Sequence, residues 1–132
     1  HLLHEALRAR TPIGPVVATA RAAAQLDGLV SCHLIDEAAL NQISSVETSQ
    51  GVISLLQLNE QPLPATLENN TLAIALDGIQ DPGNAVAIVR SAEAFGATGV
   101  VFLKGSVSPW NPKTLRASAG SLLRLPFALA LI

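Results

Sequence analysis

The sequence predicts an α/β protein with two parts, and three observations support this fold class. Hydrophobic residues make up 49% of the 132 residues and charged residues only 14%, which is typical of a chain that buries a core and not of a disordered chain. A strand, a helix and a strand follow one another between residues 71 and 103, as in a βαβ unit. Turn-forming residues around Pro64 separate this unit from earlier short elements. We therefore predict a domain of residues 1–60, a linker of residues 61–70 and a second domain of residues 71–132.

The first part is predicted to be a small α/β half. Apolar residues at helical spacing predict a helix from residue 2, and a turn follows at residues 8–14. Short apolar runs predict strands, which cover residues 16–20, 30–35 and 51–58. Between the last two strands, Asp36 is a typical N-cap and predicts a helix over residues 37–43.

The second part is predicted to begin with a buried strand. Residues 71–76 are continuously apolar and do not alternate, as expected for a strand covered on both faces. A helix of residues 85–95 ends at Gly96, and a second apolar strand covers residues 99–103. The chain is completed by a short helix and a strand-like stretch, predicted at residues 113–119 and 122–132.

Composition and spacing exclude several classes of protein. No apolar run approaches the roughly 18 residues needed to cross a bilayer, so no membrane is expected. Cys32 is the only cysteine and no secretory leader is present, so we expect a reducing cytoplasm. Cys32 itself is more typical of a small buried residue than of a nucleophile. No set of four residues has the spacing of a zinc site, so no metal is expected.

The charge distribution favours the second part as the binder of anions. The net charge is −2, so the chain has no global basic field. Before Pro64 there are three basic and six acidic residues, and after it five basic and four acidic residues. Any contact with nucleic acid is therefore expected to be local.

The loop Asp77-Gly-Ile-Gln-Asp-Pro-Gly-Asn84 is the first candidate for a site, because ligands of open α/β sheets bind beyond the carboxyl ends of the strands. Asp81 is a typical N-cap, Pro82 suits the first helical position, and free amides at a helix start attract anions. A well-capped turn without a ligand explains the same residues. The chain has no G-x-G-x-x-G and no G-K-[ST] loop, which argues against nucleotide cofactors of those kinds.

Two further segments carry basic side chains that could bind RNA or phosphate. Arg90 could offer its guanidinium to the pocket that Asn84 faces, or it could simply form an exposed ion pair with Glu93 three residues later. Arg116-Ala-Ser-Ala-Gly120 follows Lys113 and precedes Arg124, and its small residues would allow a backbone to approach closely. A tightly packed helix end with solvated charges is the alternative explanation for this second segment.

Taken together, two stretches of the sequence resemble the SpoU (TrmH-like) family of RNA ribose 2′-O-methyltransferases. The first runs from Leu76 through Asp-Pro-Gly-Asn84 and Arg90 to Phe95-Gly96, and the second is Asn111-Pro-Lys-Thr-Leu-Arg-Ala-Ser-Ala-Gly-Ser-Leu-Leu-Arg-Leu-Pro126. The first 60 residues are similar to the end of that family's RNA substrate-binding domain, an α/β module of the L7Ae and L30e group.

The resemblance implies a SPOUT-type knotted α/β methyltransferase domain that works as a homodimer. It implies methyl transfer from S-adenosylmethionine to a ribose 2′-hydroxyl of rRNA or tRNA. Arg90 would act on the hydroxyl or its phosphate with the support of Asn84, while Arg116, Ser118 and Lys113 would face the RNA. Because a guanidinium is almost never deprotonated, we assign Arg90 an orienting and charge-stabilising role.

Two features of the sequence predict that the chain is truncated at both ends. The chain contains no methionine, and both ends fall inside apolar segments. The family's later motifs, which form the knot and the S-adenosylmethionine pocket, would lie beyond Ile132, so we expect an inactive fragment whose cofactor-binding residues are absent. Two other interpretations remain open: a non-catalytic RNA-binding α/β module, and a flavodoxin-like or other doubly wound α/β domain in which the loop is accidental.

Overall fold

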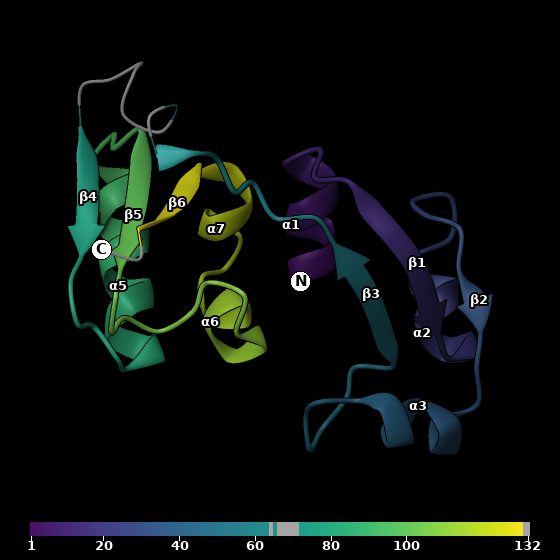
Figure 1. Cartoon of the computed structure of the whole chain (residues 1–132). Helices are drawn as coiled ribbons and strands as arrows, with labels where there is room; N and C mark the ends of the chain where they lie inside the picture. The colour runs from purple at the N-terminus through teal and green to yellow at the C-terminus, as the bar shows by residue number, and fades with distance from the viewer. Residues whose placement is uncertain (64, 66–71, 131–132) are drawn as a thin grey trace. The chain divides into compact units, whose positions relative to one another are not determined.

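The computed structural model describes residues 1–63, 65 and 72–130, which form two compact units (Figure 1). The larger unit contains residues 1–11 and 58–132, and the smaller unit contains residues 12–57. These units do not follow the predicted division into a domain of residues 1–60 and a linker of residues 61–70. Residues 1–11 group with the second half of the chain, and that half begins at residue 58. Residues 64 and 66–70 of the predicted linker lie outside the described residues.

The smaller unit is a three-stranded sheet with two short helices. Its elements are β1 (Ile13–Ala18), α2 (Ala20–Gln25), β2 (His33–Leu34), α3 (Glu37–Ile43) and β3 (Val52–Leu56). The strand order is β2-β1-β3, with β2 parallel and β3 antiparallel to β1. Val17 pairs with His33 on one side and with Ile53 on the other.

The predictions for the smaller unit are correct in kind but shifted at their ends. The helix capped by Asp36 is confirmed, because the Asp36 side chain accepts a hydrogen bond from the Ala39 amide. The predicted strand of residues 16–20 is wrong at its end, since Thr19 caps α2, a helix that the sequence analysis missed. The predicted strand of residues 30–35 contracts to β2, and the predicted turn of residues 8–14 ends where β1 begins at Ile13.

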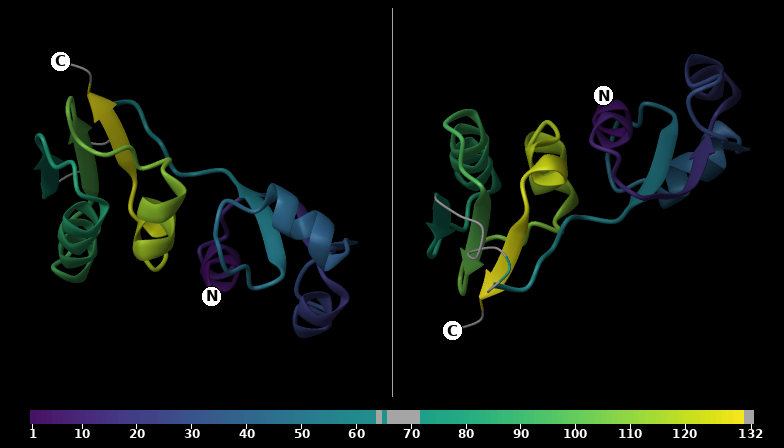
Figure 2. Two further views of the ribbon diagram at one scale, coloured as in Figure 1. Left: turned by 90° about the horizontal axis from the view of Figure 1, so that it is seen from below. Right: turned by 90° about the horizontal axis from the view of Figure 1, so that it is seen from above.

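The larger unit contains a parallel three-stranded sheet, and the helices that connect its strands lie on one face of it, as Figures 1 and 2 show. Its elements are α1 (Leu2–Arg8), β4 (Ala73–Leu76), α5 (Pro82–Ala94), β5 (Gly99–Leu103), α6 (Pro112–Ala117), α7 (Ser121–Arg124) and β6 (Phe127–Ala130). The strand order is β4-β5-β6, so β4, α5 and β5 form the predicted βαβ unit. Helix α5 packs against α6 and α7.

Two strand predictions for the larger unit need correction. Strand β4 is not covered on both faces, because it lies at an edge of the sheet and Ala73 and Ala75 are exposed. The predicted strand of residues 122–132 divides into helix α7 and strand β6, with Pro126 between them. Short apolar runs fit a buried helix as well as a strand, so the sequence could not decide this case. Residues 71, 131 and 132, which were assigned to predicted strands, lie outside the described residues.

The core of the larger unit lies between its sheet and helices. Its most deeply buried apolar side chains come from both layers: Leu76, Val89, Val100, Leu122 and Phe127. The Phe127 ring packs edge-to-face against Phe102 and Trp110. None of the helices in the described part of the chain has the length and apolar character to cross a membrane.

Candidate functional site

The loop after β4 leads directly into α5. Asp81 has an extended backbone, and its carboxylate accepts a hydrogen bond of 2.8 Å from the Asn84 amide. Pro82 occupies the first helical position, where its missing N–H costs nothing. The predicted N-cap and the predicted proline position are both confirmed, and they place Asn84 in the first turn of α5.

Because this cap is a local contact, its energetic contribution can be tested directly. We expect Asp81→Ala to lower the free energy of unfolding of the larger unit by about 1 kcal/mol, since the Asn84 amide loses its acceptor. Urea unfolding followed by the fluorescence of Trp110, the only tryptophan, measures this change. Asp81→Asn is the matched control: it keeps an acceptor oxygen and should cost much less. Equal losses for the two variants would contradict the cap.

A second loop, after β5, holds the first one in place. The Ser106 hydroxyl donates to the Leu76 carbonyl at 2.8 Å and accepts from the Ile79 amide at 3.2 Å. The Val107 amide donates to the Ile79 carbonyl at 2.8 Å. The carboxyl ends of β4 and β5 are thus tied together. The sequence analysis missed Ser106, because no local pattern reveals partners that lie 27 and 30 residues away.

Arg90 is exposed on α5, and its guanidinium has no side-chain partner among the described residues. The alternative that it pairs with Glu93 is wrong, because the Glu93 carboxylate binds Arg124 and Ser121 instead. Within residues 1–63, 65 and 72–130, Arg90 forms no ion pair and no side-chain hydrogen bond. Asn84 is exposed on the same helix. The guanidinium of Arg90 is therefore available to an anion.

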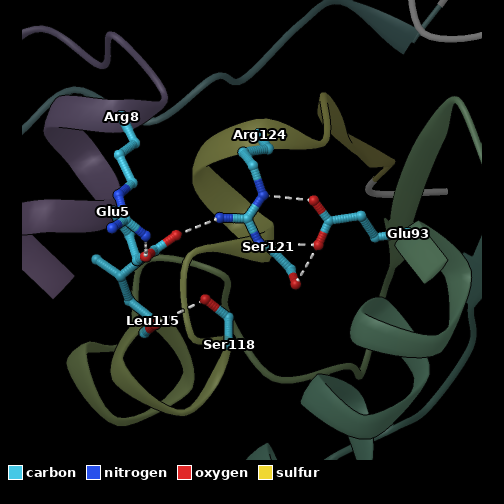
Figure 3. Close-up of polar contacts among 7 residues, drawn as sticks. All are labelled: Glu5, Arg8, Glu93, Leu115, Ser118, Ser121 and Arg124. Carbon is cyan, nitrogen blue, oxygen red and sulfur yellow. Dashed lines mark hydrogen bonds and ion pairs between the residues drawn. The ribbon is translucent and has the colours of Figure 1, made fainter. Parts of the chain in front are cut away.

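Glu93 and Arg124 form the centre of a polar cluster in the larger unit (Figure 3). Arg124 donates from Nε to Glu93 Oε1 at 2.5 Å and from Nη2 to Glu93 Oε2 at 3.0 Å. Its Nη1 donates to Glu5 Oε2 at 2.8 Å, and the Ser121 hydroxyl donates to Glu93 Oε2 at 2.6 Å. The hydrogen bond from Arg124 holds the pKa of Glu93 below its ordinary value of 4.5, against the opposing effect of burial. The same hydrogen bond raises the pKa of Arg124.

The lowered pKa of Glu93 makes part of the stability depend on pH. A carboxyl whose pKa is lower in the folded state stabilises that state above its unfolded pKa, and this contribution disappears as the pH falls through the folded pKa. We expect the difference in unfolding midpoint between the wild type and Glu93→Gln to be largest near pH 7 and to shrink below about pH 4.5. Urea titrations at several pH values measure it, and a difference that does not change with pH would refute this assignment.

Helix α6 carries the basic side chains that were predicted to face RNA. It begins at Asn111, whose side chain accepts a hydrogen bond of 2.9 Å from the Lys113 amide. Lys113 and Arg116 are exposed and three residues apart, so they lie on one side of the helix. Ser118 is fully buried, and its hydroxyl donates to the Leu115 carbonyl at 2.7 Å (Figure 3). The structure therefore does not present Ser118 to a ligand.

The five predicted site residues lie on two helices and at the end of one of them. Asn84 and Arg90 lie on α5, Lys113 and Arg116 on α6, and Ser118 at the C-cap of α6. Since α5 packs against α6, the two basic segments are neighbours in the fold. Arg124, which extended the basic segment in the sequence, is occupied by two carboxylates.

An apolar groove of about 390 Å³ lies on another part of α5. It is lined by one residue of β4, the residue that precedes this strand, and five residues at or near the later turns of α5: Ile74, Leu72, Ala87, Ile88, Ser91, Ala92 and Phe95. Ser91 is the only polar side chain among them, and the carboxyl end of β4 does not contribute. The groove is therefore separate from the loop and the basic residues described above.

Cys32 and the histidines provide no site of their own. Cys32 is half-buried, and its thiol donates to the Val30 carbonyl at 3.7 Å. Among the described residues, no group of three or more His, Cys, Asp or Glu side chains is arranged to hold a metal ion.

A protein-family model matches the part of the chain that contains both helices. Residues 71–130 match the model of the SpoU rRNA Methylase family. This part of the chain belongs to the SpoU family. We call residues 71–130 the SpoU segment. All five predicted site residues lie within it, and it also contains Glu93, Ser106 and Arg124.

Two relatives of known name are similar to the chain. The 23S rRNA (guanosine(2553)-2'-O)-methyltransferase RlmP of Bacillus subtilis is 28% identical over 128 residues, which are 96% of this chain and 50% of that protein. The mitochondrial rRNA methyltransferase 3 of Xenopus laevis is 37% identical over 93 residues, covering 67% of this chain and 22% of that protein. The chain thus spans half or less of the length of these relatives.

Solved structures of SpoU proteins have the same fold. An AdoMet-bound rRNA methyltransferase from Sinorhizobium meliloti superimposes with a TM-score of 0.75 at 28% identity, over 98% of this chain and 51% of that one. The SpoU methyltransferase AviRb from Streptomyces viridochromogenes gives a TM-score of 0.81 at 21% identity, over 99% of this chain and 53% of that one, and supports the fold alone. The mixed α/β architecture predicted from the sequence is therefore confirmed.

Proposed function

We propose that this chain is part of an RNA ribose 2′-O-methyltransferase that uses S-adenosylmethionine. The observation that carries the proposal is the free guanidinium of Arg90 on α5, next to the basic helix α6, inside the SpoU segment. The named activity of the relative RlmP, methylation of a guanosine 2′-oxygen in 23S rRNA, supports the choice of the ribose hydroxyl.

Arg90 and Asn84 would act on the reacting ribose. The guanidinium stays protonated, so it serves as a donor and a positive charge and not as a base. It would orient the 2′-hydroxyl or the adjacent phosphate and stabilise the negative charge that develops on the oxygen. Asn84, exposed in the first turn of α5, would support this arrangement through its amide group.

Lys113 and Arg116 would bind the RNA backbone. Both side chains are exposed on one side of α6, and basic side chains position a protein on nucleic acid mainly through phosphate contacts. We assign Ser118 a different role from the one that the resemblance implied. Its buried hydroxyl closes the turn after α6 through Leu115 and does not touch the RNA.

The apolar groove on α5 does not fit S-adenosylmethionine. That cofactor supplies the methyl group on a sulfonium, and its carboxylate, ammonium and ribose hydroxyls need polar partners. The groove on α5 offers only the Ser91 hydroxyl, so it does not suit such a ligand. We propose that the cofactor-binding residues and the knot belong to chain beyond residue 132, and that the 132 residues alone do not transfer a methyl group.

The smaller unit would bind the substrate RNA. Its sheet of β2, β1 and β3 with two short helices is compatible with the end of an L7Ae-like α/β module. We also propose a homodimer and a cytoplasmic location, the first from the family and the second from the single cysteine.

Calorimetry with S-adenosylmethionine tests the proposed function. The 132-residue chain and a form extended through the later family motifs are titrated in parallel, with circular dichroism to show that both are folded. Binding by the extended form alone supports the methyltransferase and places the cofactor site beyond residue 132. If neither folded form binds the cofactor but both bind RNA, the methyltransferase proposal fails and a non-catalytic RNA-binding module replaces it.

Arg90 can then be tested for its role in the reaction. In the extended protein we expect Arg90→Ala to lower kcat by a factor of about 100 to 1,000, as happens when one oxyanion-stabilising donor is removed. Arg21→Ala makes the same change at an exposed position of α2 in the smaller unit, so it can affect KM through RNA binding but is expected to leave kcat at saturating RNA unchanged. Methyl transfer from labelled cofactor measures both. An Arg90→Ala variant with wild-type kcat would exclude Arg90 from the catalytic step.

A further inference from the structure

Three elements that are distant in sequence meet at the side chain of Arg124. Arg124 lies on α7, its first partner Glu93 lies on α5, and its second partner Glu5 lies on α1 (Figure 3). The sequence separations are 31 residues to Glu93 and 119 residues to Glu5. Ser121, one turn before Arg124, donates to the same Glu93 carboxylate. One carboxylate on α5 therefore holds α7 at two positions.

This contact differs from an ordinary surface ion pair in its geometry. Exposed pairs contribute little because two flexible side chains must be ordered in solvent. Here the Glu5 and Glu93 side chains are only 15% and 28% exposed, and the Arg124 fork bonds to both oxygens of Glu93. A bidentate arginine–carboxylate pair fixes orientation as well as distance.

The backbone next to Arg124 is adapted to the same contact. Gly120 has a φ of +94° and precedes α7. A Cβ at this position would lie 2.6 Å from Arg124 Nη1 and 2.9 Å from Glu5 Cβ. The space that lets Arg124 reach Glu5 thus exists because residue 120 has no side chain.

The cluster joins α5, which carries Arg90, to α7, the helix that follows α6. Glu93 follows Arg90 by three residues on α5, so both project from one flank of that helix. On the other side, α7 follows α6 after a short turn that is closed by Ser118. Fixing α7 to α5 therefore fixes the end of the segment that carries Lys113 and Arg116.

We propose that Glu93 and Arg124 are positioning residues, which hold the segment bearing Lys113 and Arg116 in register with Arg90 on α5. This inference rests on the proposed function for its RNA ligand. Its mechanical part, that Glu93 and Arg124 hold the segment in place, concerns the protein alone. The Arg124 guanidinium is hydrogen-bonded to the Glu5 and Glu93 carboxylates and does not contact RNA. Glu93 acts on RNA only through the position of α6.

The mechanical part is tested by limited trypsin digestion of the 132-residue chain. Cleavage of a native helix requires local opening, so its rate reports how firmly a segment is held. We expect Glu93→Gln and Arg124→Lys to raise the cleavage rate after Arg116 about tenfold, with no change after Arg21 in the smaller unit. We also expect the emission of Trp110, which immediately precedes α6, to shift to longer wavelength. Glu47→Gln, an exposed loop position, is the matched control and should behave as the wild type.

The RNA part is tested by fluorescence anisotropy with a fluorescein-labelled single-stranded RNA. Glu93→Gln removes a negative charge, so electrostatics alone would make RNA binding tighter. Positioning predicts the opposite, a dissociation constant about fivefold higher, because Lys113 and Arg116 lose their alignment with Arg90. Arg124→Lys keeps the positive charge but loses the fork, and it should weaken binding to the same extent.

The outcomes separate this inference from the proposed function. Wild-type protection of Arg116 and wild-type Trp110 emission in both variants would overturn the positioning role. Tighter RNA binding by Glu93→Gln would overturn it as well, in favour of a purely electrostatic effect. If the wild type binds no RNA, the proposed function fails, and the cleavage rates still decide whether Glu93 and Arg124 hold the segment.

Discussion

Phe127→Ala is expected to lower the free energy of unfolding of the larger unit by about 3 to 5 kcal/mol, the largest effect of any substitution considered. Phe127 opens β6 and has no exposed surface. Its ring centroid lies 6.0 Å from that of Phe102 and 5.7 Å from that of Trp110, with interplanar angles of 81° and 74°. Truncation removes both edge-to-face contacts and leaves a cavity between the sheet and the segment that leads to α6.

Phe95→Ala is the matched control, since it makes the same chemical change at the C-cap of α5. The Phe95 side chain is 84% exposed, so its removal should change the free energy of unfolding by less than about 0.5 kcal/mol. Urea unfolding followed by far-ultraviolet circular dichroism suits both variants, because the fluorescence of Trp110 itself depends on Phe127. Similar losses for the two variants would mean that Phe127 is not the centre of this core.

Phe127 also affects the position of helix α6 in the candidate site. Trp110, which Phe127 supports, immediately precedes Asn111, the N-cap of α6. A protein with Phe127→Ala that is still folded should therefore hold Lys113 and Arg116 less firmly. This links the packing of β6 to the basic helix without any direct contact between Phe127 and a ligand.

The features that the sequence predicted correctly depend on contacts between near neighbours. Asp36 and Asp81 cap their helices through amides three residues away, so the residue type and its place before an apolar run suffice to find them. Strand β5 was predicted with its observed ends, because its apolar run lies between Gly99 and Lys104. Helix caps and apolar runs involve residues that are close together in the sequence, so a single sequence is enough to predict them.

The features that escaped prediction depend on contacts between distant residues. Whether Glu93 pairs with Arg90 or with Arg124 is decided by the packing of α7 on α5, which no spacing encodes. The burial of Ser118 and the two bonds of Ser106 are decided in the same way. For the candidate site, the sequence thus predicted Arg90, Lys113 and Arg116, which the structure leaves exposed, but it could not predict which side chains contact Glu93, Ser106 and Ser118.

Gly120→Ala is expected to cost about 2 to 4 kcal/mol and to disrupt the Arg124 cluster at the same time. Two effects add here. A left-handed backbone with a φ of +94° strains any residue with a side chain by roughly 1 to 2 kcal/mol. In addition, the new methyl group would lie 2.9 Å from Glu5 Cβ. Arg124 could swing away from the methyl, but Glu5 Cβ is attached directly to the backbone of α1, so the helix itself must shift.

Gly96→Ala separates these two effects, because Gly96 also has a positive φ, of +82°, but a Cβ there would meet no atom within 4 Å. Its cost is therefore the backbone strain alone, roughly 1 to 2 kcal/mol. The excess cost of Gly120→Ala over Gly96→Ala measures the steric conflict with α1. Unfolding by urea gives both values, and the trypsin cleavage rate after Arg116 should rise only for Gly120→Ala. An excess near zero would mean that α1 moves without cost, and the contact between Glu5 and Arg124 would then contribute nothing to holding α7.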